Sequence, residues 1–259
     1  MNFLTINDVQ HTYFTKSSAT TALSDVSLEI QEGEFVSFLG PSGCGKTTLL
    51  SIIAGLFKPT FGTVTLEGKQ VEKARENIGY MLQQDYLFPW KTIEENILLG
   101  LKMSKNLDGP RKRYALDLLK KMGLKGVESQ FPKQLSGGMR QRVALVRTLA
   151  TEPKLLLLDE PFSALDYQTK LKLEDLVSTT LKAFDKTAIL VTHDIGEAIA
   201  MSDRVFLFSS HPGRVYKTFH IPKELREETP FNARSHKDYS RIFQMVWKEL
   251  ESLESVAKH

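Results

Sequence analysis

The sequence has little of what a secreted or membrane-embedded protein needs. Its 259 residues include one cysteine, Cys44, so no disulfide can form within the chain, and this fits a reducing compartment. No apolar run approaches the roughly 18 to 20 residues that cross a bilayer as a helix. The first residues, MNFLTINDVQ, lack the basic start and unbroken apolar core of a secretory signal. If the protein works at a membrane, we expect another chain to span it.

The sequence also lacks a block of charge of one sign. Its 34 basic and 31 acidic residues are interspersed and give a formal net charge of +3. Chains that bind nucleic acid commonly carry a strongly basic face or tail, so we expect no nucleic-acid partner here. Internal repeats and low-complexity segments are missing too. With 41% hydrophobic and 25% charged residues, the composition is that of a soluble globular protein.

Strand-like and helix-like segments alternate along most of the chain, which predicts an α/β fold with a mainly parallel sheet covered by helices. Helical spacing of apolar residues predicts helices over 47–57, 166–183 and 240–256. Residues 1–80 add antiparallel strand signals to a strand, loop and helix unit. Strands are expected at 26–30, 35–40, 63–68, 77–82, 154–160, 187–193 and 205–210.

A helical insertion interrupts this pattern. Residues 92–151 are almost entirely helical in character, and they divide the α/β core into residues 1–91 and 152–225. TIEE, which begins at Thr92, offers a capping box, and the helix that ends in KKMG has Gly123 as a plausible C-cap. We therefore expect a separate helical subdomain.

The end of the chain, residues 226–259, is predicted to be a C-terminal helical extension. Its last helix places apolar side chains on one stripe, which favours packing on the domain over binding of a partner. The stripe consists of Ile242, Phe243, Val246, Leu250 and Leu253.

A glycine-rich segment, GPSGCGKTT, fits the pattern G-x-x-x-x-G-K-[ST] and lies between an apolar strand and a helix, as that pattern requires. Its glycines let backbone N–H groups surround phosphates, and the helix dipole adds partial positive charge. Lys46 is expected to reach the β- and γ-phosphates, and Thr47 to place its hydroxyl on Mg²⁺. Cys44 fits a small filler better than a redox switch. The predicted phosphate-binding residues are Gly40, Pro41, Ser42, Gly43, Cys44, Gly45, Lys46, Thr47 and Thr48.

The segment KLLLLDEP supplies two carboxylates at the end of an apolar strand. Asp159 is positioned to hold Mg²⁺ through water, and Glu160 could polarise the attacking water. Alone, such a run is a common strand-to-loop transition. Together with the glycine-rich loop it becomes specific for a nucleotide site.

A second anion site is predicted in LSGGMRQR, residues 135–142, which we call the signature segment. Ser136 fits the N-cap of a helix, and Gly137 and Gly138 let backbone N–H groups approach an anion closely. One chain thus carries two phosphate-binding segments, about ninety residues apart.

In their order and spacing, GPSGCGKTT, LSGGMRQR, LLLLDEP, SALD and the histidine of LVTHD resemble the ATP-binding-cassette (ABC) ATPases over about residues 1–220. The resemblance implies a P-loop NTPase cassette: an ATP-binding, RecA-like core with a mainly parallel sheet, an antiparallel β subdomain and a helical subdomain. In this family two cassettes pack head to tail. Each ATP then lies between the P-loop of one copy and the signature segment of the other, so the two anion sites serve different nucleotides.

The resemblance also assigns catalytic roles beyond Lys46 and Glu160. Gln83, after the strand IGYML, corresponds to the glutamine that senses Mg²⁺ and the attacking water, although Gln84 leaves the register open by one residue. His193 corresponds to the switch histidine, which contacts the γ-phosphate and stabilises developing charge.

Two further binding residues are implied in the same way. Tyr13 corresponds to the aromatic residue that stacks on adenine, with His11 and Phe14 close enough to compete for that role. Asp166, in SALD, belongs to the loop that crosses the dimer interface.

Within the family, the chain resembles the separate ATPase subunits of transporters, because it has one P-loop and no membrane span. LFPW and SSHPGRV (209–215) are similar to importers of the nitrate, sulfonate and taurine type, a group that includes importers of the thiamine pyrimidine precursor. FPWKT also fits a plain turn with an exposed Trp90. The implied partners are a second copy, permease subunits that hold the chain at the cytoplasmic face of the membrane, and indirectly a solute-binding protein.

A P-loop enzyme that phosphorylates a small molecule is the alternative. In that case the signature segment would be an ordinary helix start, and a permease would not stimulate ATP hydrolysis.

Overall fold

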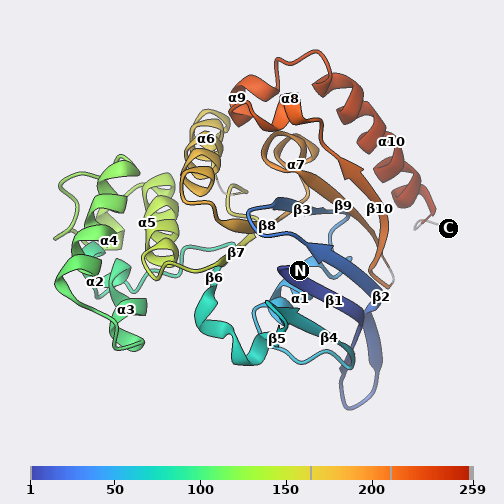
Figure 1. Ribbon diagram of the computed structural model, residues 1–259, viewed down its shortest axis with the longest axis horizontal. Coiled ribbons are helices and arrows are strands. Elements are labelled where there is room, and N and C mark those ends of the chain that lie inside the picture. Colours follow the sequence, from blue (N-terminus) through green and yellow to red (C-terminus); the bar gives the residue numbers. More distant parts are fainter. Residues whose placement is uncertain (1, 164, 211, 257–259) are drawn as a thin grey trace.

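A six-stranded sheet runs through the centre of the computed structural model, which describes residues 2–163, 165–210 and 212–256 (Figure 1). Its strand order is β10-β9-β3-β8-β7-β6, and each neighbouring pair is parallel except β10 with β9. Because parallel strands share one carboxyl edge, the loops that follow β3, β6, β7 and β8 all leave from the same edge. The strands are β3 (Phe35–Leu39), β6 (Ile78–Met81), β7 (Leu155–Asp159), β8 (Thr187–Thr192), β9 (Arg204–Ser209) and β10 (Arg214–His220).

The central strands are covered on both faces. Every residue of β3, β7 and β8 is buried, as expected for parallel strands between two layers. Along β7, Leu155 and Leu157 face one apolar core, whereas Leu156 and Leu158 face another, because successive side chains of a strand point to opposite faces. The covering helices are α1 (Lys46–Ile53), α5 (Gly137–Leu149), α6 (Tyr167–Ala183) and α7 (Ile195–Met201).

A four-stranded antiparallel sheet, in the order β2-β1-β4-β5, packs with α1 against the first of these faces. Its inward side chains, among them Ile6, Val9 and Val26, share a core with Leu50 and Ile53 of α1. The helix α1, which directly follows the glycine-rich segment, is therefore held between two sheets. The elements of this part are β1 (Leu4–Phe14), β2 (Ala19–Ile30), β4 (Phe61–Leu66), β5 (Lys69–Gln70), η1 (Val71–Lys73) and η2 (Arg75–Asn77).

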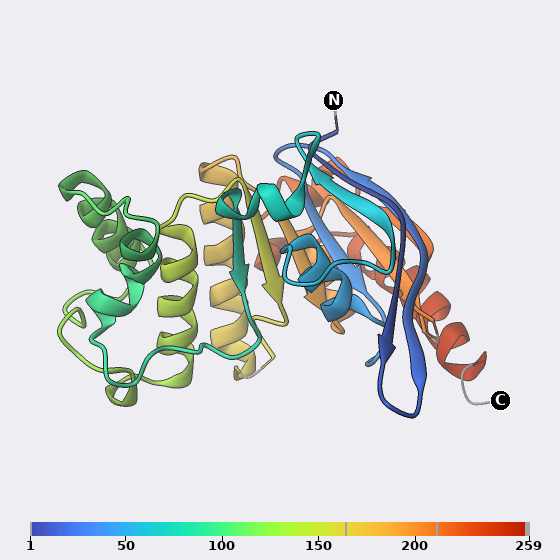
Figure 2. The same cartoon turned by 90° about the horizontal axis from the view of Figure 1, so that it is seen from below.

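The helical insertion projects to one side of the sheets, and we call α2 to α5 the helical arm (Figure 2). The predicted capping box is confirmed: the Thr92 side chain accepts from the Glu95 N–H, and the Glu95 carboxylate accepts from the Thr92 N–H. Gly123 follows the end of α4 with a φ of 71°, the left-handed conformation that glycine adopts without steric cost. The remaining elements are α2 (Ile93–Ile97), α3 (Leu99–Met103), α4 (Gly109–Lys121) and η3 (Pro132–Gln134).

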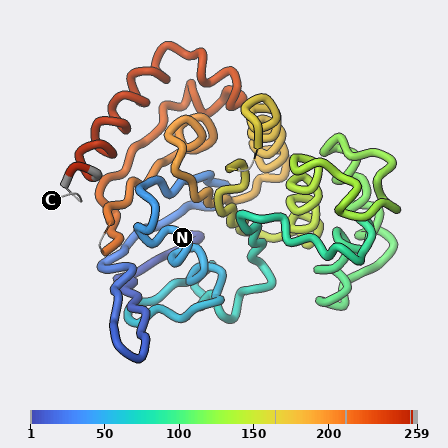
Figure 3. Tube along the Cα trace, turned by 180° about the vertical axis from the view of Figure 1, so that it is seen from behind, coloured from blue at the N-terminus to red at the C-terminus, as the bar shows by residue number. Residues whose placement is uncertain are grey.

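The C-terminal extension lies on the opposite side from the helical arm, with its last helix along the outside of the molecule (Figure 3). Ile242 and Val246 are buried against the core formed by α7 and β9, and Phe243, Leu250 and Leu253 pack on it partly buried. The predicted packing of this stripe on the domain is confirmed. The extension contains α8 (Lys223–Arg226), α9 (Pro230–Ala233) and α10 (Tyr239–Val256).

The predicted α/β fold class is confirmed, and the differences are local. The helix predicted over 47–57 ends at Ile53, because Gly55 turns the chain with a φ of 69°. The strand predicted at 77–82 ends at Met81, and the strand predicted at 26–30 begins at Ala19. Strands β1, β5 and β10 were not predicted individually. Within the described residues, no helix is both long and apolar enough to cross a bilayer. Two residues of the quoted motifs, Ala164 of SALD and His211 of SSHPGRV, lie outside the described residues.

A buried carboxylate joins the extension to the core. The Glu174 side chain on α6 is fully buried, and its Oε2 lies 2.6 Å from Nη2 of Arg234, which follows α9. Burial raises the pKa of Glu174 to about 7, although Arg234 partly offsets this. The folded protein therefore holds a proton on Glu174 at pH values where the unfolded chain has released it.

This difference predicts a pH-dependent stability. Because the folded state binds the Glu174 proton more tightly, the free energy of unfolding should fall as the pH rises from about 4.5 to about 7. The slope from this one group is at most about 1.4 kcal/mol per pH unit. Urea denaturation at several pH values should show a flatter dependence for Glu174→Gln than for the wild type. Glu251→Gln, on the exposed face of α10, is the control and should leave the slope unchanged.

Candidate active site

The predicted P-loop residues and the predicted catalytic residues meet at the carboxyl edge of the central sheet, whereas the predicted signature residues and Asp166 do not. The P-loop, residues 40–48, follows β3; Glu160 follows β7; and His193 follows β8. Gln83 lies two residues beyond the end of β6. Since β3, β8, β7 and β6 are consecutive in the sheet, segments far apart in the sequence become neighbours.

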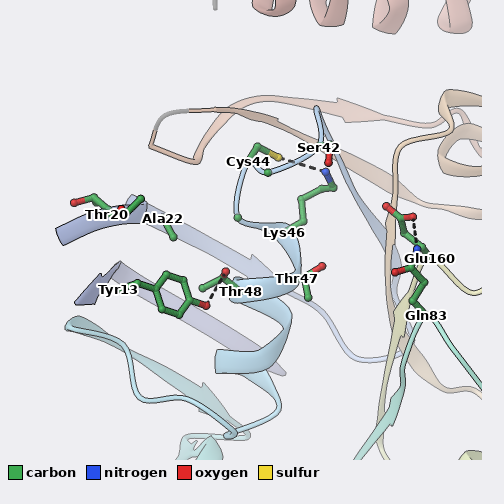
Figure 4. A pocket seen from close by; sticks show the side chains of 13 residues that line it. Tyr13, Thr20, Ala22, Ser42, Cys44, Lys46, Thr47, Thr48, Gln83 and Glu160 are labelled. Atoms are coloured by element: carbon green, nitrogen blue, oxygen red, sulfur yellow. Dashed lines mark hydrogen bonds between the residues drawn. The ribbon is translucent and has the colours of Figure 1, made fainter. Parts of the chain in front are cut away.

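A pocket of about 520 Å³ opens at this edge, with the P-loop on one side and Glu160 and Gln83 across from it (Figure 4). Its size is within the range of small-molecule and cofactor sites. Polar and small side chains make up most of its wall, which suits a polar, charged ligand. The lining residues are Tyr13, Thr20, Thr21, Ala22, Ser42, Gly43, Cys44, Gly45, Lys46, Thr47, Thr48, Gln83 and Glu160.

The shape of the P-loop depends on glycines in left-handed conformations. Gly45, the N-cap of α1, has a φ of 89°, and a Cβ there would lie 2.7 Å from Cδ2 of Leu23 and 2.8 Å from the Ala22 carbonyl oxygen. Gly43 has a φ of 78° and faces open space. Glycine at 45 thus lets the loop pack on β2, and glycine at 43 keeps the pocket side open for a ligand.

Lys46 is folded back onto its own loop. Its Nζ donates to the carbonyl oxygens of Gly40, at 2.7 Å, and Pro41, at 2.8 Å, and lies 3.4 Å from Sγ of Cys44. The Cys44 side chain is buried, and burial raises the pKa of its thiol. This placement supports Cys44 as a packing residue and puts the ammonium group at the rim of the anion cradle.

Oxygen ligands converge below the loop. The Thr47 Oγ1 hydroxyl donates to Oδ1 of Asp159 at 3.1 Å, and the Tyr80 hydroxyl lies 3.4 Å from the other carboxylate oxygen. Burial raises the pKa of Asp159, and the neighbouring Glu160 carboxylate adds to the rise. A hydroxyl and a carboxylate are the hard oxygen donors that Mg²⁺ prefers, with the rest of its shell completed by water and substrate phosphates. The residues present therefore fit Mg²⁺. Within the described residues, no cluster of three or more potential metal-ligating His, Cys, Asp or Glu side chains occurs.

Glu160 lies at the centre of a hydrogen-bonded group. Its Oε1 is 3.2 Å from Nδ1 of His193, and its Oε2 accepts from Nε2 of Gln83 at 3.2 Å. The Glu160 backbone has a φ of 45°, unusual for a residue other than glycine, and its N–H donates to the Val191 carbonyl of β8 at 2.9 Å. Strained backbone of this kind is common where a catalytic side chain must be aimed. Gln83, rather than Gln84, lines the pocket.

The signature helix α5 holds the segment that carries Gln83. Gln141 donates to the Gln83 carbonyl at 3.0 Å, and Arg147 donates to the carbonyls of Asp85, at 2.7 Å, and Tyr86, at 2.8 Å. Arg140 forms an ion pair with the Asp85 carboxylate at 2.9 Å. The position of Gln83 is therefore coupled to that of α5.

Ser136 and Asp166 lie apart from the residues that line the pocket. Each is the N-cap of a helix, and this confirms the cap that the sequence predicts at Ser136. Ser136 accepts from the Met139 N–H at 3.3 Å, and Asp166 accepts from the Thr169 N–H at 3.0 Å. None of Ser136, Gly137, Gly138 or Asp166 lines the 520 Å³ pocket. One copy of the chain does not bring its two anion sites together.

Sequence reasoning missed parts of the pocket wall. Thr20, Thr21 and Ala22 of β2 line it, and Gly213, in the turn after β9, packs on the P-loop so closely that a Cβ would lie 2.0 Å from the Cys44 carbonyl oxygen. The PG pair in SSHPGRV marks a turn, but only the tertiary structure shows what the turn touches. Tyr13 lines the pocket, and its hydroxyl lies 3.1 Å from Oγ1 of Thr48.

Comparison with known proteins gives a consistent picture. The family model described as ABC transporter matches residues 23–163. The chain is 61% identical over 254 residues to the ABC transporter ATP-binding protein YtlC of Bacillus subtilis (strain 168), and the match covers 98% of each chain. It is 41% identical over 241 residues to the aliphatic sulfonates import ATP-binding protein SsuB of Bacillus licheniformis, covering 92% of this chain and 91% of that relative. A dimeric, post-hydrolysis structure of the ATP-binding cassette MJ0796 bound to ADP and Pi matches with a TM-score of 0.76 and 35% identity, over 85% of this chain and 99% of that one.

The position of Lys46 predicts a loss of nucleotide binding in Lys46→Ala. This change removes the cation at the phosphate cradle, and a charge-assisted hydrogen bond of this type is worth roughly 10- to 100-fold in affinity. ATP turnover should fall to background, and calorimetry should show the weaker binding. Lys58→Ala, an exposed lysine just beyond α1, is the matched control and should bind ATP as the wild type does. Turnover at the wild-type rate in Lys46→Ala would remove this residue from the mechanism.

Proposed function

The chain belongs to the ABC transporter ATP-binding proteins, and we propose that two copies of it hydrolyse ATP between them to drive solute uptake through a separate permease. As a member of this family it is an ATPase, and its relatives include import ATP-binding proteins. Family membership argues against the small-molecule kinase alternative. The observation that supports the dimer is the separation of the two anion sites, since the signature residues lie outside the pocket that contains the P-loop.

ATP is proposed to bind with its triphosphate in the P-loop and its adenine beside Tyr13. Backbone N–H groups of residues 42–48 and the N-terminus of α1 would surround the phosphates, and Lys46 would turn from the carbonyls of Gly40 and Pro41 toward the β- and γ-phosphates. Tyr13 is 41% exposed and lies beside the pocket, so its ring can accept a stacked base. Mg²⁺, held by Thr47 and Asp159 with Gln83 nearby, would neutralise phosphate charge.

Hydrolysis is proposed to depend on Glu160. Its carboxylate accepts one hydrogen bond from Gln83 and faces His193, so one group can orient a water molecule and accept its proton. His193 would stabilise the charge that develops on the γ-phosphate, and Gln83 would hold the water in line. All three side chains come from loops that leave adjacent parallel strands.

The second copy is proposed to complete the site. Ser136 and the N–H groups of Gly137 and Gly138 lie at the start of α5, a helix of 13 residues, and would bind the γ-phosphate held by the opposite P-loop. Asp166 lies in the loop after Glu160 and would meet the same loop of the other copy. A γ-phosphate shared by two chains explains why ATP would hold the dimer together and hydrolysis would release it.

The permease contact is proposed on the loop between β6 and the helical arm. Trp90 is 70% exposed and Tyr86 is 58% exposed, and Phe88 packs edge-on against Trp90 with 5.4 Å between ring centroids. Exposed aromatic side chains of this kind are common anchors for a partner helix. The helix α5 binds this loop at the carbonyls of Asp85 and Tyr86. A movement of the permease that displaces the loop would therefore change the position of Gln83. We propose that the chain serves an importer of the nitrate, sulfonate and taurine group, or of the thiamine-precursor type. The exposed aromatic loop and the segments LFPW and SSHPGRV support this assignment. The chain would be bound at the cytoplasmic face of the membrane, and a solute-binding protein would serve the permease.

The shared γ-phosphate predicts an ATP-bound dimer in Glu160→Gln. Glutamine keeps the shape of the side chain but is too weak a base, so hydrolysis should fall by on the order of 10²- to 10⁴-fold while ATP binding survives. Light scattering with ATP should then show a lasting dimer, whereas the wild type should dimerise only transiently.

The double variant Glu160→Gln, Ser136→Arg tests which surface forms the dimer. Arginine at 136 blocks the signature segment, so this variant should stay monomeric with ATP. A dimer that persists in it would show that LSGGMRQR does not bind the opposite nucleotide.

The aromatic loop predicts a specific crosslink. The one native thiol, Cys44, is buried, so a cysteine introduced by Trp90→Cys would be the accessible one. It should crosslink to the permease in membranes that contain both proteins. Lys248→Cys, on the exposed side of α10, is the control and should not react. Crosslinks from position 248 in place of position 90 would move the docking surface to the extension.

A further inference from the structure

A partly buried lysine that the proposed mechanism does not use lies close to the switch histidine. Lys170 is on α6, four residues after the N-cap Asp166, and its side chain is 16% exposed. Its Nζ lies 2.6 Å from Oδ2 of Asp194 and 2.6 Å from Oε1 of Glu197. Asp194 directly follows His193, and Glu197 lies one turn into α7.

Both carboxylates fix the backbone around His193. Oδ1 of Asp194 caps α7 by accepting from the N–H groups of Gly196, at 2.6 Å, and Glu197, at 3.1 Å. Oε2 of Glu197 accepts from the Thr192 hydroxyl, and that hydroxyl accepts from the Asp194 N–H at 2.9 Å. The residues before and after His193 thus belong to one network.

The imidazole itself has little else to orient it. The His193 side chain is 62% exposed, and its Nδ1 lies 3.2 Å from Oε1 of Glu160. Its position therefore follows from the backbone of residues 192–194. That backbone is tied by Lys170 to α6, the helix that begins just after the loop carrying Glu160.

Lys170 remains charged in this site. Burial disfavours the ammonium form, but the bonds to Asp194 and Glu197 outweigh burial and raise the pKa of Lys170. Glu197 is 5% exposed at its side chain, so removal of Lys170 would leave two neighbouring carboxylates without the cation that both contact. The turn that carries His193 would then shift or loosen.

We infer that Lys170 is a positioning residue for ATP hydrolysis, which holds the His193 turn in register with Glu160 through Asp194 and Glu197. This inference rests on the role proposed above for His193. It also links two loops that leave neighbouring strands, because α6 follows the loop after β7 and the His193 turn follows β8. Lys170 is not among the residues that line the 520 Å³ pocket, and its ion pairs are with Asp194 and Glu197, so we expect its effect to pass through the His193 turn.

The test compares Lys170→Met with Lys170→Arg and with a matched control. Methionine keeps the length and apolar stem of lysine but removes the charge. The kcat for ATP hydrolysis should fall on the order of 10- to 100-fold, as expected for a displaced catalytic group, and KM should stay within about twofold of the wild-type value. Arginine can reach both carboxylates and should restore most of kcat. Lys154→Met removes another lysine paired at 2.7 Å, with Glu67, and should leave kcat unchanged.

A double-mutant cycle with His193→Ala separates positioning from general stability. If Lys170 acts through His193, Lys170→Met should reduce kcat no further in a His193→Ala background. If Lys170→Met does not fold, Asp194→Asn replaces it in both arms, because asparagine still caps α7 but loses the ion pair.

The outcomes are distinguishable. Wild-type kcat in Lys170→Met, an equal loss in Lys154→Met, or a full additional loss in the His193→Ala background would each overturn the inference while leaving the role of His193 intact. Wild-type kcat in His193→Ala itself would instead refute the proposed role of His193, and this inference would fall with it.

Discussion

The parallel alignment of β3, β8, β7 and β6 is the constraint on which the site depends. Each of these strands ends at the same edge. The P-loop, the His193 turn, the carboxylates of Asp159 and Glu160, and Gln83 lie at or just beyond the ends of β3, β8, β7 and β6 in turn. A strand inserted into this order would separate Glu160 from His193 or Gln83, which now lie 3.2 Å from it on either side. The central strands are fully buried, as expected for parallel strands that are covered on both faces.

Loops at this edge are held by two different physical means. Tight backbone packing shapes the P-loop, where Gly45 and Gly213 leave no room for a side chain. Ion pairs and hydrogen bonds hold the other loops: Lys170 with Asp194 and Glu197 beside His193, and Arg140 with Asp85 beside Gln83. The shape of the P-loop thus depends on glycines, whereas the positions of the His193 turn and of the segment after Gln83 depend on charged side chains of α6 and α5.

The helix α5 carries the signature residues at its start and contacts the segment of Gln83 further along. Its first turn carries the signature residues, and Gln141 and Arg147 further along bind the carbonyls of residues 83, 85 and 86. A nucleotide bound at Ser136 would therefore act on the rigid element that positions Gln83. Through α5, a second copy bound at Ser136 would be connected to the exposed loop around Trp90 and to Gln83 beside Glu160. This connection requires no contact between Ser136 and the pocket of its own chain.

The sequence by itself determined the local chemistry: the P-loop and its helix, the carboxylates at the end of β7, Ser136 as an N-cap, the capping box at Thr92 and the buried stripe of α10. These features depend on spacing within a few residues, so periodicity and residue type are enough to find them. The tertiary structure alone decided the strand order, the choice of Gln83 as the pocket residue, the contact of Gly213 with the P-loop and the pairing of Lys170 and Arg234 with buried carboxylates. Each of these joins residues from different elements. Strand β10 escaped prediction because most of its side chains are exposed, so no apolar pattern marks it, and its place is set by pairing with β9.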